Sequence, residues 1–105
     1  MLNNIILVGR LVNEVKVEGE ERKKYSITLA VNRSFKNIDG EYETDFVPVT
    51  LWGPIGENTK EYCHKGDVVG IKGRIQCQDN NVEIIAEKVT FLSSKKADEN
   101  DRETD

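Results

Sequence analysis

The alternation of apolar and polar side chains along the chain predicts β-structure in five segments. Residues 25–33, "YSITLAVNR", alternate cleanly, as a strand with one buried face does. The other segments with strand character are residues 4–12, 44–53, 67–77 and 82–92. Between the third and the fourth segment, apolar residues of the stretch 53–67 recur at helical spacing. The predicted order is therefore three strands, one short helix and two strands.

This order of elements indicates a fold class. It is the order of the five-stranded Greek-key barrel known as the OB-fold, whose helix lies between strands 3 and 4. Gly70 and Gly73 in the fourth segment suit the sharp bends of a small barrel. The sequence therefore predicts an all-β OB-fold domain over residues 1–92, followed by a short, disordered acidic tail over residues 93–105.

The third predicted strand, "TDFVPVTLWG", places aromatic residues on its outer face. Phe46 and Trp52, the only Trp of the chain, are an even number of residues apart and share that face with Pro48. Unpaired bases stack on exposed aromatic rings for about 1–3 kcal/mol each. The pattern predicts a stacking platform for an unpaired strand, although a loop or a subunit interface could equally cover the two rings. Pro48 lacks an N–H donor, so we expect an edge, a bulge or a gap in the pairing there.

Other aromatic residues have patterns typical of the core. Tyr25 shares a face with the apolar residues of its strand, Tyr62 falls at helical spacing and Phe91 lies in the last strand. We expect all three to be buried.

The distribution of charge adds a basic track to this platform. The formal net charge is −4, whereas nucleic-acid-binding domains are usually basic overall. The placement of individual cations can matter more than the net charge of the chain. Lys72 and Arg74 share the outer face of the fourth strand, and Arg33 and Lys36 lie near the aromatic residues. These four cations could follow the phosphates of a bound strand.

The sequence gives little evidence for a catalytic site or a metal site. Cys63 and His64 are neighbours on a predicted helix, where successive side chains point about 100° apart, so they form a poor nucleophile–base pair. One His and two Cys fall short of a structural zinc set. We expect a protein that is not an enzyme and has no cofactor.

The sequence also bears on location and assembly. No run is apolar enough to span a membrane and no signal peptide is evident, so we expect a cytoplasmic, nucleoid-associated protein with reduced thiols and no membrane partner. Segment 4–12 is apolar on both faces, with Ile6 and Val8 opposite the face of Leu7. A small barrel needs only one face for its own core, so the other predicts self-association.

The ordered motifs "MLNNIILVGRL", "ITLAVNRSFKN", "GEYETDF", "LWG", "EYCHKGDVVGIKGRIQ" and "AEKVTFL" resemble the bacterial-type single-stranded DNA-binding protein family over about residues 1–92. The resemblance implies an OB barrel, usually a homotetramer, that binds single-stranded DNA without sequence preference in replication, recombination or repair. It assigns base stacking to Phe35, Phe46 and Trp52. The basic positions that match the DNA contacts of the family are Arg10, Arg33, Lys36, Lys72 and Arg74.

The chain departs from this family in two places. The hairpin between the last two strands shrinks to a tight turn at residues 78–81, "QDNN", which removes a fourth stacking site. The chain ends in "DRETD" instead of an apolar Pro-Phe, so we do not expect its tail to recruit replication or repair enzymes. The alternative function is an OB-fold adaptor of a replication or restart complex, whose main ligand is a protein.

Overall fold

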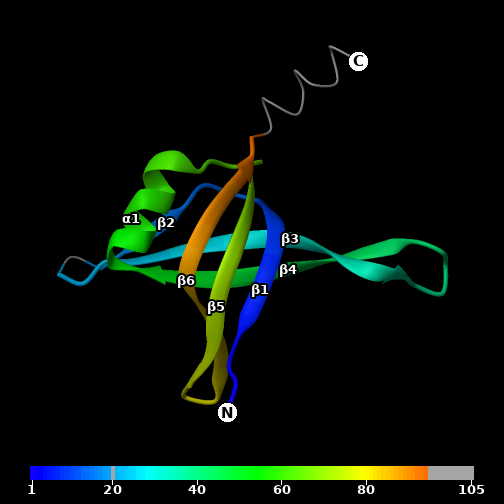
Figure 1. Cartoon of the computed structure of the whole chain (residues 1–105), viewed down its shortest axis with the longest axis horizontal. Helices are drawn as coiled ribbons and strands as arrows, with labels where there is room; N and C mark the ends of the chain where they lie inside the picture. Colours follow the sequence, from blue (N-terminus) through cyan, green and yellow to red (C-terminus); the bar gives the residue numbers. More distant parts are fainter. Residues whose placement is uncertain (20, 95–105) are drawn as a thin grey trace.

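The computed structural model describes residues 1–19 and 21–94, and it confirms the predicted barrel (Figure 1). Its elements are β1 (Ile5–Leu11), β2 (Lys16–Glu18), β3 (Lys24–Lys36), β4 (Tyr42–Trp52), α1 (Gly53–Tyr62), β5 (Val68–Gln78) and β6 (Asn81–Ser93). β2 is a short addition to the five predicted strands, and it forms a hairpin with β3. The predicted tail lies outside the described residues, apart from its first two positions.

Five strands close the barrel. The strand order is β1-β5-β6-β4-β3-β2, and β1 also pairs with β3 through Arg10↔Ala30 and Leu11↔Leu29. A single parallel bridge, Thr50↔Ile85, joins β4 to β6. In Figure 1, β1, β5 and β6 cross in front of β3 and β4. The OB-fold is thus confirmed, with its helix between β4 and β5.

The core consists of the inward-facing residues of the barrel strands and gives the barrel two opposite outer surfaces. The fully buried side chains are Leu11, Ile27, Leu29, Val49, Leu51, Val69 and Ile71. Leu29 and Val49 come from the β3–β4 layer, whereas Val69 and Ile71 come from β5. Because both layers pack against the same core, their outward-facing neighbours point away from each other.

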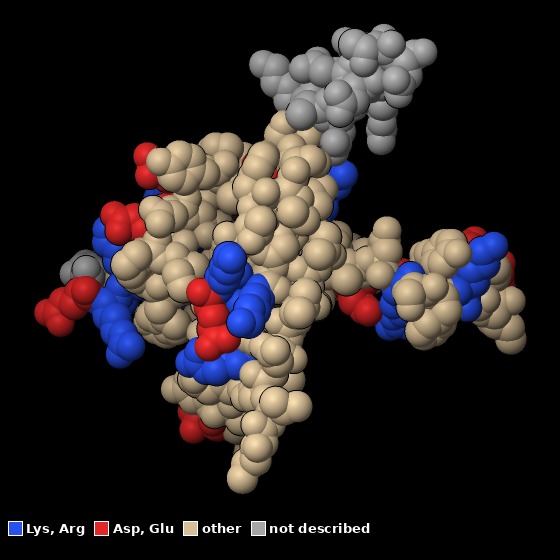
Figure 2. Space-filling model, viewed as in Figure 1, with Lys and Arg blue, Asp and Glu red and all other residues tan. Residues whose placement is uncertain are grey.

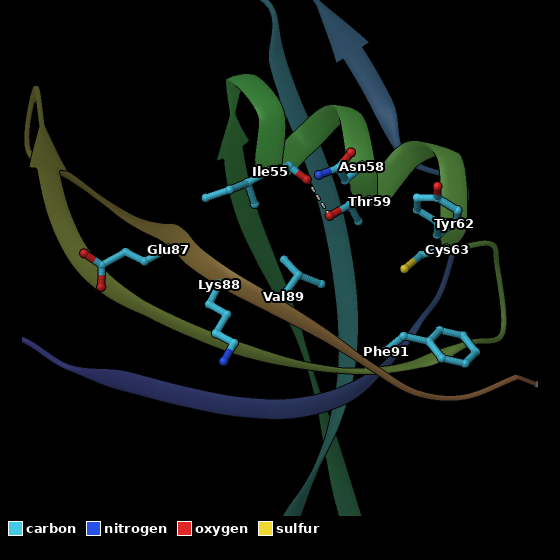
Figure 3. A pocket seen from close by; sticks show the side chains of 9 residues that line it. All are labelled: Ile55, Asn58, Thr59, Tyr62, Cys63, Glu87, Lys88, Val89 and Phe91. Carbon is cyan, nitrogen blue, oxygen red and sulfur yellow. Dashed lines mark hydrogen bonds between the residues drawn. The ribbon is translucent and has the colours of Figure 1, made fainter.

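The helix α1 covers one end of this core, and its backbone lies very close to the Tyr25 ring. A Cβ atom on Gly56 would lie 2.1 Å from the Tyr25 ring, so only glycine allows this contact. Tyr25 is buried, as predicted. The predictions for Tyr62 and Phe91 were wrong, because both are exposed and line a hollow of about 410 Å³ between α1 and β6 (Figure 3). α1 buries Gly56 and Thr59, and Tyr62 lies in its last turn, beyond these contacts.

The β3–β4 and β5–β6 turns follow their sequence signals. In the β3–β4 turn, the Asn37 Oδ1 atom accepts hydrogen bonds from the N–H groups of Asp39 and Glu41. The β5–β6 turn has Asp79 and Asn80 at φ values of 50° and 67°, which is typical of a two-residue hairpin.

Pro48 leaves the main pairing of its strand intact. The β3–β4 ladder runs through Thr28↔Pro48 without a register shift, and β4 meets β6 only at Thr50. Pro48 therefore lies where the second edge of β4 is unpaired, which confirms the expected edge.

Candidate nucleic-acid interface

The outer face of β3 and β4 combines aromatic side chains on one strand with small side chains on the other. Phe46 lies opposite Ala30, and Pro48 lies opposite Thr28. Because β3 offers nothing large enough to cover it, the Phe46 side chain remains 66% exposed. Ala30 is also the register partner of Arg10 on β1, so the Arg10 side chain and the Phe46 ring flank the same small residue. This part of the face is an open aromatic surface, with Arg10 two strands away in the pairing.

Trp52 is the second aromatic residue of this face, and a cation already covers its ring. The Cζ atom of Arg22, in the loop between β2 and β3, lies 5.0 Å from the ring centroid. Lys24 lies directly opposite Trp52 in the β3–β4 register. The half-buried Trp52 is therefore held in a cation–π contact, and a base that stacks on the same side of the ring must move Arg22.

A carboxylate separates the two aromatic positions. Thr50, between Phe46 and Trp52 on β4, is only 6% exposed. Its hydroxyl donates a 2.6 Å hydrogen bond to Oε1 of Glu83 from β6, and Lys24 Nζ lies 3.4 Å from the same oxygen. The Thr50 hydrogen bond, followed by the charge of Lys24, lowers the pKa of Glu83 and keeps it ionised at neutral pH. The outer face thus holds two aromatic side chains with a negative charge between them, rather than one continuous aromatic surface.

Phe35 lies apart from this face, near the end of the long β3–β4 hairpin that extends to the right in Figure 1. Its side chain is 68% exposed, close to a register shift between Asn32 and Lys36. The Lys36 Nζ atom lies 5.8 Å from the centroid of Tyr42, which is also exposed. The hairpin thus presents two accessible rings and one cation.

Arg33 on the same hairpin is engaged by two carboxylates. Its Nε and Nη2 atoms bond to Asp45 over 2.9 to 3.3 Å, and Nη1 bonds to Glu43. The hydrogen bonds and charge of Asp45 raise the pKa of Arg33, and Arg33 lowers the pKa of Asp45. Figure 2 shows acidic and basic side chains mixed along this hairpin. A phosphate would have to compete with these carboxylates for Arg33.

The remaining predicted cations are divided between two sides of the barrel. Lys72 lies on β5, opposite Ile6 and Lys88, on the layer that faces away from Phe46. The Arg74 Nη1 atom lies 3.5 Å from the Glu87 carboxylate. Figure 2 shows this mixture of charges over β5 and β6. Arg10 is the one predicted cation that the pairing brings next to Phe46, and its Nη1 atom donates to the Gly66 carbonyl.

Three residues at this interface were absent from the sequence prediction: Arg22, Lys24 and Glu83. Arg22 reaches Trp52 from the loop between β2 and β3, whereas the positions of Lys24 and Glu83 depend on the strand register. Lys24 is the last residue of a charged stretch, and the β3–β4 alignment pairs it with Trp52. Glu83 reaches Thr50 only because β6 pairs with β4. The sequence did contain one signal for Lys24: its even separation from Ser26 and Thr28 places it on the same outward face of the strand.

Other chemistry is sparse in residues 1–19 and 21–94. Within that part of the chain, no three His, Cys, Asp or Glu side chains are grouped as a metal site would require. No helix there is long and apolar enough to cross a membrane. Cys63 is buried and Cys77 is exposed, and both are free thiols.

Comparisons with known proteins agree with this arrangement. The model of the single-strand binding protein family matches residues 2–92. Single-stranded DNA-binding protein 1 of Clostridium acetobutylicum is 38% identical over 109 residues, which cover 90% of this chain and 97% of that protein. Single-stranded DNA-binding protein B of Bacillus subtilis is 41% identical over 106 residues, which cover 90% and 94%.

A solved structure matches the fold. A deletion mutant of the single-stranded DNA binding protein from Thermus aquaticus superimposes with a TM-score of 0.71 at 20% identity. The match covers 90% of this chain and 52% of that one, so this chain spans about half of its length. The family match and the two relatives show that the chain belongs to the single-strand binding protein family.

Proposed function

We propose that the protein binds single-stranded DNA by stacking bases on Phe46 and Trp52 of β4 and on Phe35 of the β3–β4 hairpin. The observation that carries this proposal is the exposed Phe46 ring, whose cross-strand partner on β3 is the small residue Ala30. Stacking is indifferent to base identity because every base has an aromatic face. The protein would act as a binding protein, not an enzyme, in replication, recombination or repair.

Cations near the rings would hold the phosphates. Arg10 flanks Phe46 across Ala30, and Arg22 and Lys24 flank Trp52. When a base stacks on Trp52, Arg22 leaves the ring and its guanidinium becomes available to the adjacent phosphate. This exchange replaces one cation–π contact by a base stack and a charge-assisted hydrogen bond.

The other predicted cations lie farther from Phe46 and Trp52 and would contact more distant parts of a bound DNA strand. Lys36 is accessible beside Tyr42, and Arg33 can contribute once it leaves its carboxylates. Lys72 lies opposite Ile6 on β1 and would contact only a strand that passes around the barrel. Arg74 pairs with Ile85, the β6 partner of Thr50, and lies nearer the stacking face.

The protein would work as an assembly. Ile6 and Val8 of β1 are 75% and 55% exposed, as the sequence predicted. Two adjacent apolar side chains on one exposed strand favour a second copy of the chain as cover. We propose a homotetramer, in the cytoplasm and associated with the nucleoid.

A titration with single-stranded DNA tests the proposed function. Trp52 fluorescence should be quenched by a thymidine oligonucleotide, since Trp52 is the only Trp. Phe46→Ala should weaken binding by about 1–3 kcal/mol for each base lost from the stack. Ile38→Ala, on the exposed hairpin turn, is the control. Affinity should fall with salt, with a log–log slope of about −0.7 per phosphate contacted. No binding at low salt would favour the adaptor alternative.

A further inference from the structure

The face of β4 that carries Phe46 and Trp52 continues onto the β3–β4 hairpin and reaches Tyr42. Alternate residues of a strand lie on the same side of a sheet, and β4 is one unbroken strand from Tyr42 to Trp52. The register shift near the hairpin end does not disturb this alternation, since β3 advances four positions, from Asn32 to Lys36, while β4 advances two. Figure 1 shows the hairpin twisting as it leaves the barrel, so a DNA strand that follows this face would wind with it.

Tyr42 is as accessible as the stacking residue next to it. Its side chain is 58% exposed, close to the 66% of Phe46. Its cross-strand partner is Lys36, whose Nζ atom lies 5.8 Å from the centroid of the Tyr42 ring. A single ammonium at this distance covers at most one side of a ring. The other side of the ring is therefore free to receive a base.

The charges around Tyr42 suit a nucleotide better than those between Phe46 and Trp52. The residue between Tyr42 and Phe46 on this face is Thr44, whose hydroxyl donates a 2.7 Å hydrogen bond to Oδ1 of Asn32. The carboxylates of Glu43 and Asp45 alternate with these residues and belong to the other face of the strand. A phosphate beside Tyr42 thus meets the Lys36 ammonium on an otherwise uncharged stretch of the face.

The spacing of the rings allows one DNA strand to contact all three. Strand residues advance by about 3.3 Å, so Tyr42 lies about 13 Å from Phe46 along β4, and Phe46 lies about 20 Å from Trp52. A nucleic-acid strand advances by about 3.4 Å per nucleotide when its bases are stacked, and by more when it is extended. A single strand can therefore place non-adjacent bases on Trp52, Phe46 and Tyr42 in turn.

We propose that Tyr42 and Lys36 form a further nucleotide subsite, in which the Tyr42 ring stacks a base and the Lys36 ammonium binds the adjacent phosphate. The family resemblance assigns stacking to Phe35, Phe46 and Trp52, but not to Tyr42. The inference rests on the proposed function, and it extends the bound strand from the barrel onto the hairpin.

Titration of the full chain with thymidine oligonucleotides of increasing length tests this subsite, with the fluorescence of Trp52 as the signal. Tyr42→Ala should weaken binding of a long oligonucleotide by about five- to a hundredfold, the loss expected for one stacked base. Its affinity should stop rising at a length shorter by up to about four nucleotides, the number that spans 13 Å at 3.4 Å each. Tyr42→Phe keeps the ring and should bind like the wild type.

Tyr62→Ala is the matched control, because Tyr62 is an equally exposed tyrosine on α1, at the opposite end of the molecule from the hairpin (Figure 1). It should keep the affinity and the length dependence of the wild type. Wild-type values for Tyr42→Ala, alongside weakened binding by Phe46→Ala, would overturn this inference alone. Equal losses in Tyr42→Phe and Tyr42→Ala would also overturn it, since the hydroxyl rather than the ring would then be responsible. Failure of the wild-type protein to bind any of the oligonucleotides would overturn the proposed function as well.

Discussion

At the scale of single residues, the main feature of the interface is that its cations are already engaged. Arg33 is held by Asp45 and Glu43, Arg74 by Glu87, and Arg22 by the ring of Trp52. Exposed ion pairs contribute only about 0–1 kcal/mol. A phosphate can therefore displace the carboxylates, but it gains less than it would from an unpaired cation.

Release of Arg33 should strengthen DNA binding. The double variant Glu43→Gln, Asp45→Asn removes both carboxylates that hold the guanidinium. We expect tighter binding and a salt slope that is steeper by about 0.7, the value for one more phosphate contact on a single strand. Fluorescence titrations at several salt concentrations measure both quantities.

The control for this prediction removes the same charge from the same hairpin. Asp39→Asn with Glu41→Gln alters two carboxylates that make no contact with Arg33 in the described structure. This control should tighten binding less and leave the slope nearly unchanged. Equal slopes in the two double variants would show that general repulsion, rather than Arg33, is responsible.

At the scale of elements, the loop after α1 is held on the end of β1. The Gly66 N–H donates to the Leu11 carbonyl, and the Leu11 N–H donates to the Asp67 carbonyl. Glu14 adds a side-chain contact, because its Oε2 atom accepts the Lys65 N–H at 2.6 Å and its Oε1 atom lies 3.1 Å from His64 Nδ1. These contacts fix the helix end relative to the strand that closes the barrel.

Glu14 should make folding stability depend on acid pH. The Lys65 hydrogen bond, followed by His64, lowers the pKa of Glu14 from its ordinary value of 4.5. A carboxylate whose pKa is lower in the folded state stabilises that state above its unfolded pKa, and the contribution is lost as pH falls through the folded value. Glu14→Gln should therefore be less stable than wild type at neutral pH, and the difference should vanish in acid below 4.5.

Urea unfolding at a series of pH values measures this effect. Glu57→Gln on α1 changes the same kind of charge on an exposed position and is the matched control. If Glu14→Gln followed the wild-type stability at every pH, the contact of Glu14 with Lys65 and His64 would carry no net energy.

Elements were more predictable than the contacts between them. Alternation fixed the faces of Phe46 and Trp52, and the glycine and asparagine signals fixed both hairpin turns, because these features depend on neighbours in the sequence. The burial of Thr50 under Glu83 and the capture of Arg33 depend on register, which no local pattern specifies. Tyr62 was misassigned for a related reason, since helical spacing does not tell where a helix leaves the barrel.

At the scale of the whole molecule, the barrel has two outer surfaces with different chemistry. The β3–β4 face holds Phe46 and Trp52, whereas the β1–β5 face holds Ile6 and Val8. On the latter, Ile6 lies opposite Lys72 and Val8 lies opposite Gly70. Gly70 has no side chain beside Val8, and the Leu92 side chain lies next to this position. Assembly through this face would leave the stacking face open, since the two point away from each other.

An acidic substitution on β1 should therefore break the assembly without unfolding the barrel. Ile6 is 75% exposed, so Ile6→Asp removes little packing within one chain, but it places a charge at the centre of the proposed contact. Sedimentation velocity should show a tetramer for the wild-type protein and a smaller species for the variant, with unchanged circular dichroism. Ile38→Asp, at a fully exposed isoleucine of the β3–β4 turn, should remain assembled. A wild-type monomer at micromolar concentration would contradict the proposal, and an Ile6→Asp tetramer would move the contact to another face.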